Sequence, residues 1–105
     1  MTRVNVYIWQ RPMKDKLNMM VADYDEVDLK DFVMVYYTKK MVNFKKINDM
    51  LDALYVQLSN DYPDDYHARS LGASDLIMIR DPESGKVINY IVDLVGFKEV
   101  KVNIS

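Results

Sequence analysis

Residues 43–60 carry the feature that most constrains the fold of this chain, an apolar stripe with the period of an α-helix. Apolar side chains recur there at spacings of three and four residues, and the opposite positions are polar or charged. The stripe consists of Ile47, Met50, Leu51, Leu54 and Leu58. Asn43 is placed to cap the helix, and Asn60 with Pro63 downstream ends it. Such a stripe is typical of a core face rather than a cofactor pocket, so the remaining segments must supply a surface that buries it.

The segments around this helix have the two-residue alternation of β-strands. The stretch "VNVYIWQ" alternates apolar with other side chains, and "FVMVYYTK" is rich in the aromatic and β-branched residues that suit a sheet. After the helix, "DLIMIRD" and "KVINYIVDLV" flank a turn made by Asp81, Pro82 and Gly85, which predicts an antiparallel hairpin. Gly96 then marks a bulge or tight turn before a last strand, "FKEVKVNIS".

These elements predict an α+β fold in the order β-β-α-β-β-β, with an antiparallel sheet of about five strands packed on one main helix. Residues 11–31 carry many charges without a clean period, so we expect a connector there, with a short helix around Leu17–Val21. The length of 105 residues fits a single domain, 1–105.

Composition excludes several classes of protein. No apolar run approaches the length of about 20 residues that a helical membrane span needs. The chain has no cysteine, which excludes disulfides and thiolate metal sites. The start of the chain lacks the layout of a signal peptide, so we expect a cytoplasmic protein. A formal net charge of −2 argues against nucleic acid as a partner, and the cluster Lys39, Lys40, Lys45 and Lys46 is interpreted as a solvated surface beside the helix start.

The stretch "YPDDYHARSLGASDLIMI" holds the residues that most resemble an active site. His67 is the one histidine, so Asp64 and Asp65 have no second histidine or cysteine with which to complete a zinc site. Ser70 and Ser74 have no clearly positioned base, and the three glycines form no phosphate loop. We therefore expect no catalytic, cofactor-binding or metal-binding residue. In this interpretation Asp64, Asp65, Ser70, Ser74 and Asp75 bond backbone amides in turns that precede the strand.

Asp93 interrupts an otherwise apolar strand and needs its own explanation. It either faces the solvated side of the sheet or is a buried carboxylate that requires a partner, for which Arg69 is the natural candidate. An Arg69 side chain that reaches Asp93 or Asp75 would tie residues 62–75 to the terminal hairpin.

The succession "LDALYVQLSNDYPDDYHARSLGASDLIMI" and then "YIVDLVGFKEV" resembles the YodL-like domain family over residues 51–100. The pattern is carried by Asn60, Pro63, Asp65, Tyr66, Arg69, Ser70, Leu71, Ser74, Asp75, Tyr90, Val92, Asp93, Gly96 and Phe97. The chain departs from the family pattern at Gly72, where serine is usual, and at His67 and Ala68, where an Arg-Gly pair is usual.

The resemblance implies a domain that occurs as small proteins and as modules of large polyvalent proteins of phages and conjugative elements, without a known enzymatic activity. We therefore expect a non-enzymatic module, a monomer or homodimer, that binds or inhibits a host or defence protein. The alternatives are a small metal-dependent hydrolase or nuclease that uses residues 64–75, and a nucleic-acid-binding domain. The candidate contact residues are Pro63, Asp65, Tyr66, Arg69, Ser70, Ser74, Asp75, Asp93, Gly96 and Phe97.

Overall fold

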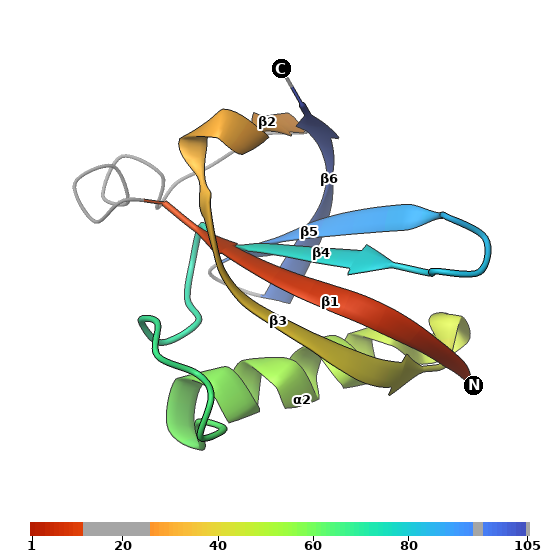
Figure 1. Ribbon diagram of the computed structural model, residues 1–105, viewed down its shortest axis with the longest axis horizontal. Helices are drawn as coiled ribbons and strands as arrows, with labels where there is room; N and C mark the ends of the chain where they lie inside the picture. The colour runs from red at the N-terminus through yellow and green to blue at the C-terminus, as the bar shows by residue number, and fades with distance from the viewer. Residues whose placement is uncertain (12–25, 94–95, 105) are drawn as a thin grey trace.

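Six strands form one sheet in the part of the chain that the computed structural model describes, which is residues 1–11, 26–93 and 96–104. The strands are β1 (Thr2–Gln10), β2 (Glu26–Asp28), β3 (Val33–Val42), β4 (Leu76–Arg80), β5 (Val87–Asp93) and β6 (Gly96–Asn103). Their order across the sheet is β2-β6-β5-β4-β1-β3. The helix α2 (Ile47–Asn60) lies along one face, and β2 is the edge strand beside β6, at the opposite edge of the sheet from β3 (Figure 1). The predicted α+β class is confirmed.

The amphipathic helix is present, with a tighter first turn than the sequence indicates. A 3₁₀ turn, η3 (Phe44–Lys46), precedes α2, and the side chain of Asn43 accepts a hydrogen bond from the Lys45 amide at 3.0 Å. Asn43 therefore caps the 3₁₀ turn that leads into the helix. Leu51, Leu54 and Leu58 are at most 2% exposed and pack against the sheet, which confirms the predicted core face.

The prediction of about five antiparallel strands is wrong in one respect. β2 adds a sixth strand, and it pairs with β6 in parallel through Val27 and Val102, so the sheet is mixed. Only three residues long, β2 lies in a charged stretch and shows no alternation. Tertiary pairing and the burial of Val27 hold it in place, and neither leaves a signal in the local sequence.

The two sheet faces are buried to different extents. The main core lies between α2 and one face, which presents Val4, Val6, Ile8, Ile77 and Ile79 among others. A smaller core on the other face joins Val27, Phe32, Leu76, Ile91 and Val100. The short turn η2 (Leu29–Asp31) and β2 lie beside this second core, which occupies one end of that face.

Both predicted turns of the terminal strands are confirmed. Gly85 has a φ of +76°, and the Asp81 side chain accepts a hydrogen bond from the Glu83 amide at 3.0 Å. Gly96 has a φ of +90° and pairs with Asp93, so the antiparallel pairing of β5 with β6 reaches the last residue of β5 and the first of β6. Glycine adopts these positive φ values without the steric cost that a β-carbon imposes.

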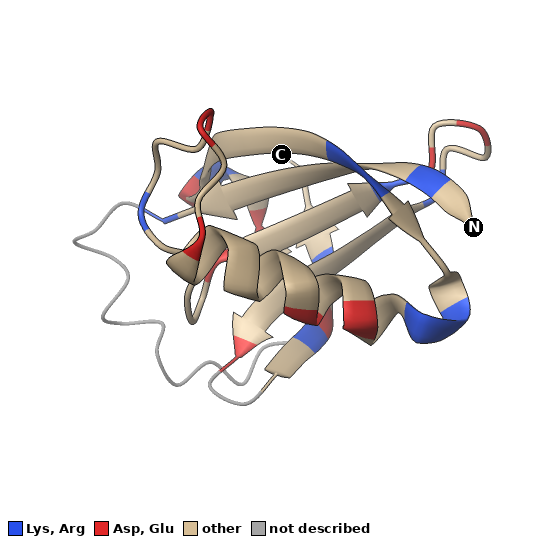
Figure 2. Cartoon of the chain, turned by 90° about the horizontal axis from the view of Figure 1, so that it is seen from below, with Lys and Arg blue, Asp and Glu red and all other residues tan. Residues whose placement is uncertain are grey.

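Two further predictions need comment. The short helix expected around Leu17–Val21 lies outside the described residues. Lys39 and Lys40 belong to β3, ahead of the turn that holds Lys45 and Lys46, so the four lysines do not all flank the helix start. Figure 2 shows basic positions at the turn before α2 and acidic positions along the helix. None of the helices in the described ranges is long and apolar enough to cross a membrane.

Candidate functional site

Residues 62–75, here called the corner, connect α2 to β4 and contain most of the candidate contact residues. At its centre the Asp75 carboxylate is completely buried. Its Oδ2 atom accepts hydrogen bonds from the Gly72 amide at 2.9 Å and from Gln10 Nε2 at 3.2 Å. The first bond confirms that Asp75 bonds a backbone amide within a turn. The second joins the corner to the end of β1.

Arg69 ties the corner to β1 a second time. Its carbonyl oxygen accepts hydrogen bonds from Gln10 Nε2 at 3.0 Å and from the Tyr66 hydroxyl. Its guanidinium donates to the carbonyl of Arg11, the residue that follows β1. Arg69 therefore bonds the last residue of β1 through its backbone and the residue after β1 through its side chain.

Backbone hydrogen bonds fix the two ends of the corner. The Leu71 amide donates to the Leu58 carbonyl at 3.1 Å, so the chain folds back on the last turn of α2. The Ser74 amide donates to the Val92 carbonyl at 2.8 Å, and the Val92 amide donates to the Asp75 carbonyl at 2.9 Å. These last two bonds fix the register of β4 against β5, in which Ile77 pairs with Tyr90.

Three tyrosines, Tyr36 of β3 and Tyr62 and Tyr66 of the corner, form a cluster. The Tyr66 ring stacks on Tyr62 at 5.6 Å and meets the edge of Tyr36 at 5.1 Å, and the Tyr36 hydroxyl donates to Asp65 Oδ1 at 3.0 Å. Burial, and next the negative charge of Asp75, raise the pKa of Tyr66 to about 12. The phenol therefore keeps its proton to a higher pH than a free tyrosine does.

The serines of the corner do not cap backbone amides as predicted. Ser74 adopts a φ of +76°, and its buried hydroxyl makes no hydrogen bond with the described residues. Its role is in the backbone, where a left-handed residue turns the chain into β4. The Ser70 hydroxyl bonds the Tyr62 hydroxyl, and Asp65 likewise bonds a tyrosine instead of an amide.

Asp93 belongs to a second location, at the β5–β6 turn. Its side chain is exposed, so the alternative of a buried carboxylate is wrong and the solvated alternative is correct. Asp93, Gly96 and Phe97 line a hollow of about 200 Å³ together with Asp52 and Tyr55 of α2. The structure thus brings Pro63, Asp65, Tyr66, Arg69, Ser70, Ser74 and Asp75 together and places Asp93, Gly96 and Phe97 at a separate turn.

The corner has the chemistry of a structural network. His67 is exposed. Within residues 1–11, 26–93 and 96–104, no group of three or more acidic or histidine side chains is arranged to hold a metal ion. The corner contacts described above either lie within the corner or join it to Gln10 and Arg11, β3, α2 and β5.

Sequence reasoning missed a surface on the sheet face opposite α2. Pairing places alternate residues of β1, β3, β4 and β5 on this face, beyond the second core. This surface, here called the open face, consists of Arg3, Asn5, Tyr7, Tyr37, Lys39, Met41, Met78, Arg80, Val87 and Asn89. The rings of Tyr7 and Tyr37 lie 5.1 Å apart, and the Tyr37 hydroxyl donates to Asn5 Oδ1 at 3.1 Å. Three cations and no acidic residue are among its members.

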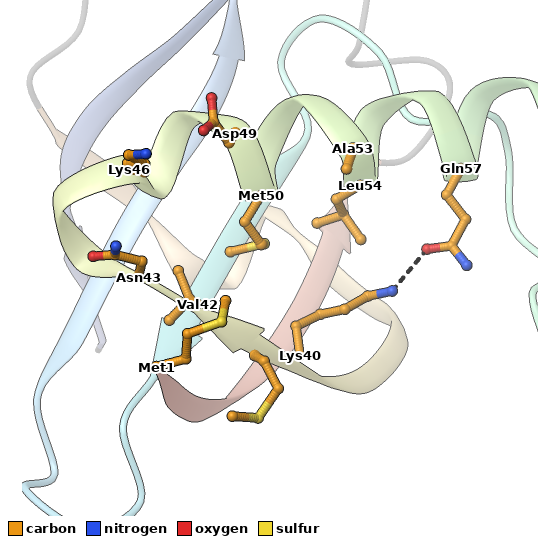
Figure 3. Close-up of a pocket in the computed structure, with 11 residues that line it drawn as sticks. Met1, Lys40, Val42, Asn43, Lys46, Asp49, Met50, Ala53, Leu54 and Gln57 are labelled. Carbon is orange, nitrogen blue, oxygen red and sulfur yellow. Dashed lines mark hydrogen bonds between the residues drawn. The ribbon is translucent and has the colours of Figure 1, made fainter.

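A hollow of about 450 Å³ lies between the end of β3 and α2 (Figure 3). Its apolar wall includes Val42, Met50, Ala53 and Leu54. Lys40 crosses its rim, where Nζ donates to Gln57 Oε1 at 2.9 Å. The hollow is therefore apolar inside and basic at the edge that borders β3.

The feature of the sequence that indicates the open face is the alternation of apolar and other residues along β1. Asn5 and Tyr7 occupy the positions between the apolar residues of their strand, so they face away from the core. The sequence does not show which strands are neighbours, and without the strand order Arg3, Lys39 and Arg80 cannot be placed on one surface.

Comparison with known proteins gives one match. The family model described as YodL-like domain matches residues 5–102, a span that includes the corner, the helix and nearly all of the open face. No curated protein and no solved structure matches the chain.

Proposed function

The chain belongs to the YodL-like domain family, and from that premise we propose that it is a non-enzymatic protein-interaction module whose contact surface is the open face. The observation that carries the proposal is the make-up of this face. Tyr37 is 42% exposed, Met41 is 50% exposed, and exposed Arg3, Lys39 and Arg80 surround them. Tyrosine, methionine and arginine are enriched in protein interfaces.

The charge of the open face indicates an acidic partner. The net charge of the chain is −2, yet no acidic residue is among the described residues that make up this face beside the three cations. Complementary charge speeds association and selects among partners. The resemblance to phage and conjugative-element proteins adds the finer proposal that the partner is a host or defence protein and that binding inhibits it.

A nucleic acid is the competing ligand, because aromatic rings and cations on a sheet also suit single strands. The net negative charge of the chain favours the protein. The corner in this proposal is architecture that holds β1, β4 and α2 together, and no reaction is assigned to it.

The test uses affinity capture from host lysate with two baits, the unchanged chain and an Arg80→Glu, Tyr37→Ser variant. A matched control bait carries Lys101→Glu, Tyr55→Ser, which makes similar changes away from the open face. We expect a protein that is retained by the unchanged and control baits, is lost from the open-face variant, and binds in purified form. Tight, steeply salt-dependent binding of a single-stranded oligonucleotide by the unchanged chain, with no such protein, would overturn the proposal.

A further inference from the structure

β3 is an edge strand of ten residues, and within the described ranges no strand pairs with its outer side. We propose that this edge binds an extended, acidic segment of a protein partner as an added strand. The inference rests on the proposed function, because it specifies how a protein partner is held.

The pairing pattern shows which backbone groups are available. The Asp81 amide donates to the Lys86 carbonyl, and in antiparallel pairs the residues that exchange hydrogen bonds alternate along each strand. The registers of β4 with β5, of β1 with β4 and of β1 with β3 extend this alternation across the sheet to β3. The N–H and C=O groups of Thr38 and Lys40 are then directed toward β1. The N–H and C=O groups of Tyr37, Lys39 and Met41 are therefore directed outward. Such a row of backbone donors and acceptors is complementary to another extended chain.

Charge defines the chemistry of that chain. Lys39 lies on the open face and Lys40 on the helix side of β3, so an added strand would have a lysine beside each of its two faces. Arg3 pairs with Met41 one strand further in and extends the positive charge. Glutamate or aspartate in the added strand would lie beside these cations.

The hollow between β3 and α2 defines a second requirement for the added strand, the kind of side chain that it directs toward the helix. An added strand directs every other side chain toward the helix side, next to the rim formed by Lys40. The wall of Met50, Ala53 and Leu54 is apolar, so a valine- or leucine-sized side chain fits its chemistry. Backbone pairing would give affinity, and this hollow would give selectivity.

The same charges argue against a second copy of this chain on the edge. Two β3 strands that paired antiparallel around Lys39 would place Lys39 and Lys40 of one copy beside those of the other. Like charges directly opposite one another destabilise a strand pair. An acidic segment has no such cost.

The test uses a fluorescein-labelled ten-residue peptide in which glutamate alternates with valine. Two protein variants form a matched pair: Lys39→Ala removes the charge alone, and Lys39→Pro removes the charge and the outward N–H. Proline is tolerated on an edge strand where the N–H faces solvent, and circular dichroism would verify the fold. A second peptide carries N-methyl groups on alternate residues, so the comparison does not depend on the proline variant.

We expect saturable binding of the first peptide to the unchanged chain, a loss of about threefold in affinity with Lys39→Ala, and a further loss of about tenfold with Lys39→Pro. Amide hydrogen exchange should slow at Tyr37, Lys39 and Met41 when the peptide binds. No saturable binding, equal binding of the N-methylated peptide, or unchanged exchange at these amides would overturn the proposal.

The partner obtained by capture separates this inference from the proposed function. A purified partner that requires the open face but binds Lys39→Pro as tightly as Lys39→Ala would refute strand addition and leave the proposed function standing. Oligonucleotide binding without any protein partner would refute both. Self-association that is abolished by Lys39→Pro, without peptide binding, would replace the acidic segment with a second copy.

Discussion

The side-chain amide of Gln10 donates a hydrogen bond to the buried carboxylate of Asp75 across 65 positions of sequence. Gln10 ends β1 and Asp75 immediately precedes β4, so the bond connects the end of one strand to the residue before its neighbour begins. The same nitrogen of Gln10 also donates to the Arg69 carbonyl. One glutamine thus holds both the corner and the start of β4.

Replacing Asp75 should therefore destabilise the fold. Asp75→Ala leaves the Gly72 amide and the Gln10 side chain without their buried acceptor, and we expect a loss of about 2–4 kcal/mol in the free energy of unfolding. Asp64→Ala is the control, because Asp64 is an exposed carboxylate in the same corner and should change stability by less than about 0.5 kcal/mol. Urea denaturation measures both, and equal small effects would contradict the role of Asp75.

Arg69 should couple energetically to Asp75 and not to Asp93. The charges of Arg69 and Asp75 both act on the Tyr66 phenol, in opposite directions, whereas Asp93 is exposed at the β5–β6 turn. Double-mutant cycles should give a coupling above about 1 kcal/mol for Arg69 with Asp75 and additive losses for Arg69 with Asp93. The reverse result would restore the link between the corner and the terminal hairpin.

The helix core should respond strongly to truncation. Leu51 and Leu54 are buried against the sheet, so Leu51→Ala and Leu54→Ala should each cost about 2–5 kcal/mol through lost transfer energy and a cavity. Asp52 lies between them on the exposed side of α2, and Asp52→Ala should stay within about 0.5 kcal/mol. Thermal or urea unfolding that gave the same small value for all three would disprove the assigned face.

Stability should fall at alkaline pH because of Tyr66. Its pKa rises from 10.0 to about 12 on folding, so the folded chain keeps its proton over a range in which the unfolded chain loses it. The contribution is complete below pH 10 and is lost as the pH rises toward 12. Tyr66→Phe should flatten this decline in urea midpoints, and absorbance titration of the phenolate should lose its latest step. A decline of unchanged slope in Tyr66→Phe would assign the effect to other groups.

His67 should be dispensable for folding and for metal response. It is exposed, so His67→Ala should shift the free energy of unfolding by less than about 0.5 kcal/mol. A ligand that binds only the folded state raises Tm, and we expect no zinc site, so added zinc should leave Tm unchanged. A zinc-dependent rise in Tm that disappears in His67→Ala would reopen the hydrolase alternative.

The local sequence pattern predicted most helices, strands and turns of this fold. It missed the strand that forms only through pairing with a distant strand. The stripe from Ile47 to Leu58, the Gly85 turn and the Gly96 turn all express local preferences, and each is present. Glu26–Asp28 became a strand only because β6 was available beside it, and a three-residue segment is too short to show a period. The parallel direction of that pair is equally invisible in the local sequence.

The corner was predicted as a folded structure, but most of its contacts were not. Asp75 as an acceptor of a backbone amide follows from the turn preferences of aspartate, and this was confirmed. The partners from outside the corner, Gln10, Arg11 and Tyr36, lie in or directly after strands whose position no local signal reveals. Ser74 was misjudged because its contribution is a left-handed backbone rather than a hydroxyl.

The position of β1 in the interior of the sheet has a consequence for synthesis on the ribosome. β1 emerges before both of its neighbours in the sheet, β3 on one side and β4, which begins at Leu76, on the other. A nascent chain that has exposed only the residues before β4 therefore presents β1 with one side unpaired, and such edges invite association with other chains. That side of β1 stays open until Leu76–Arg80 have left the ribosome and can pair with it.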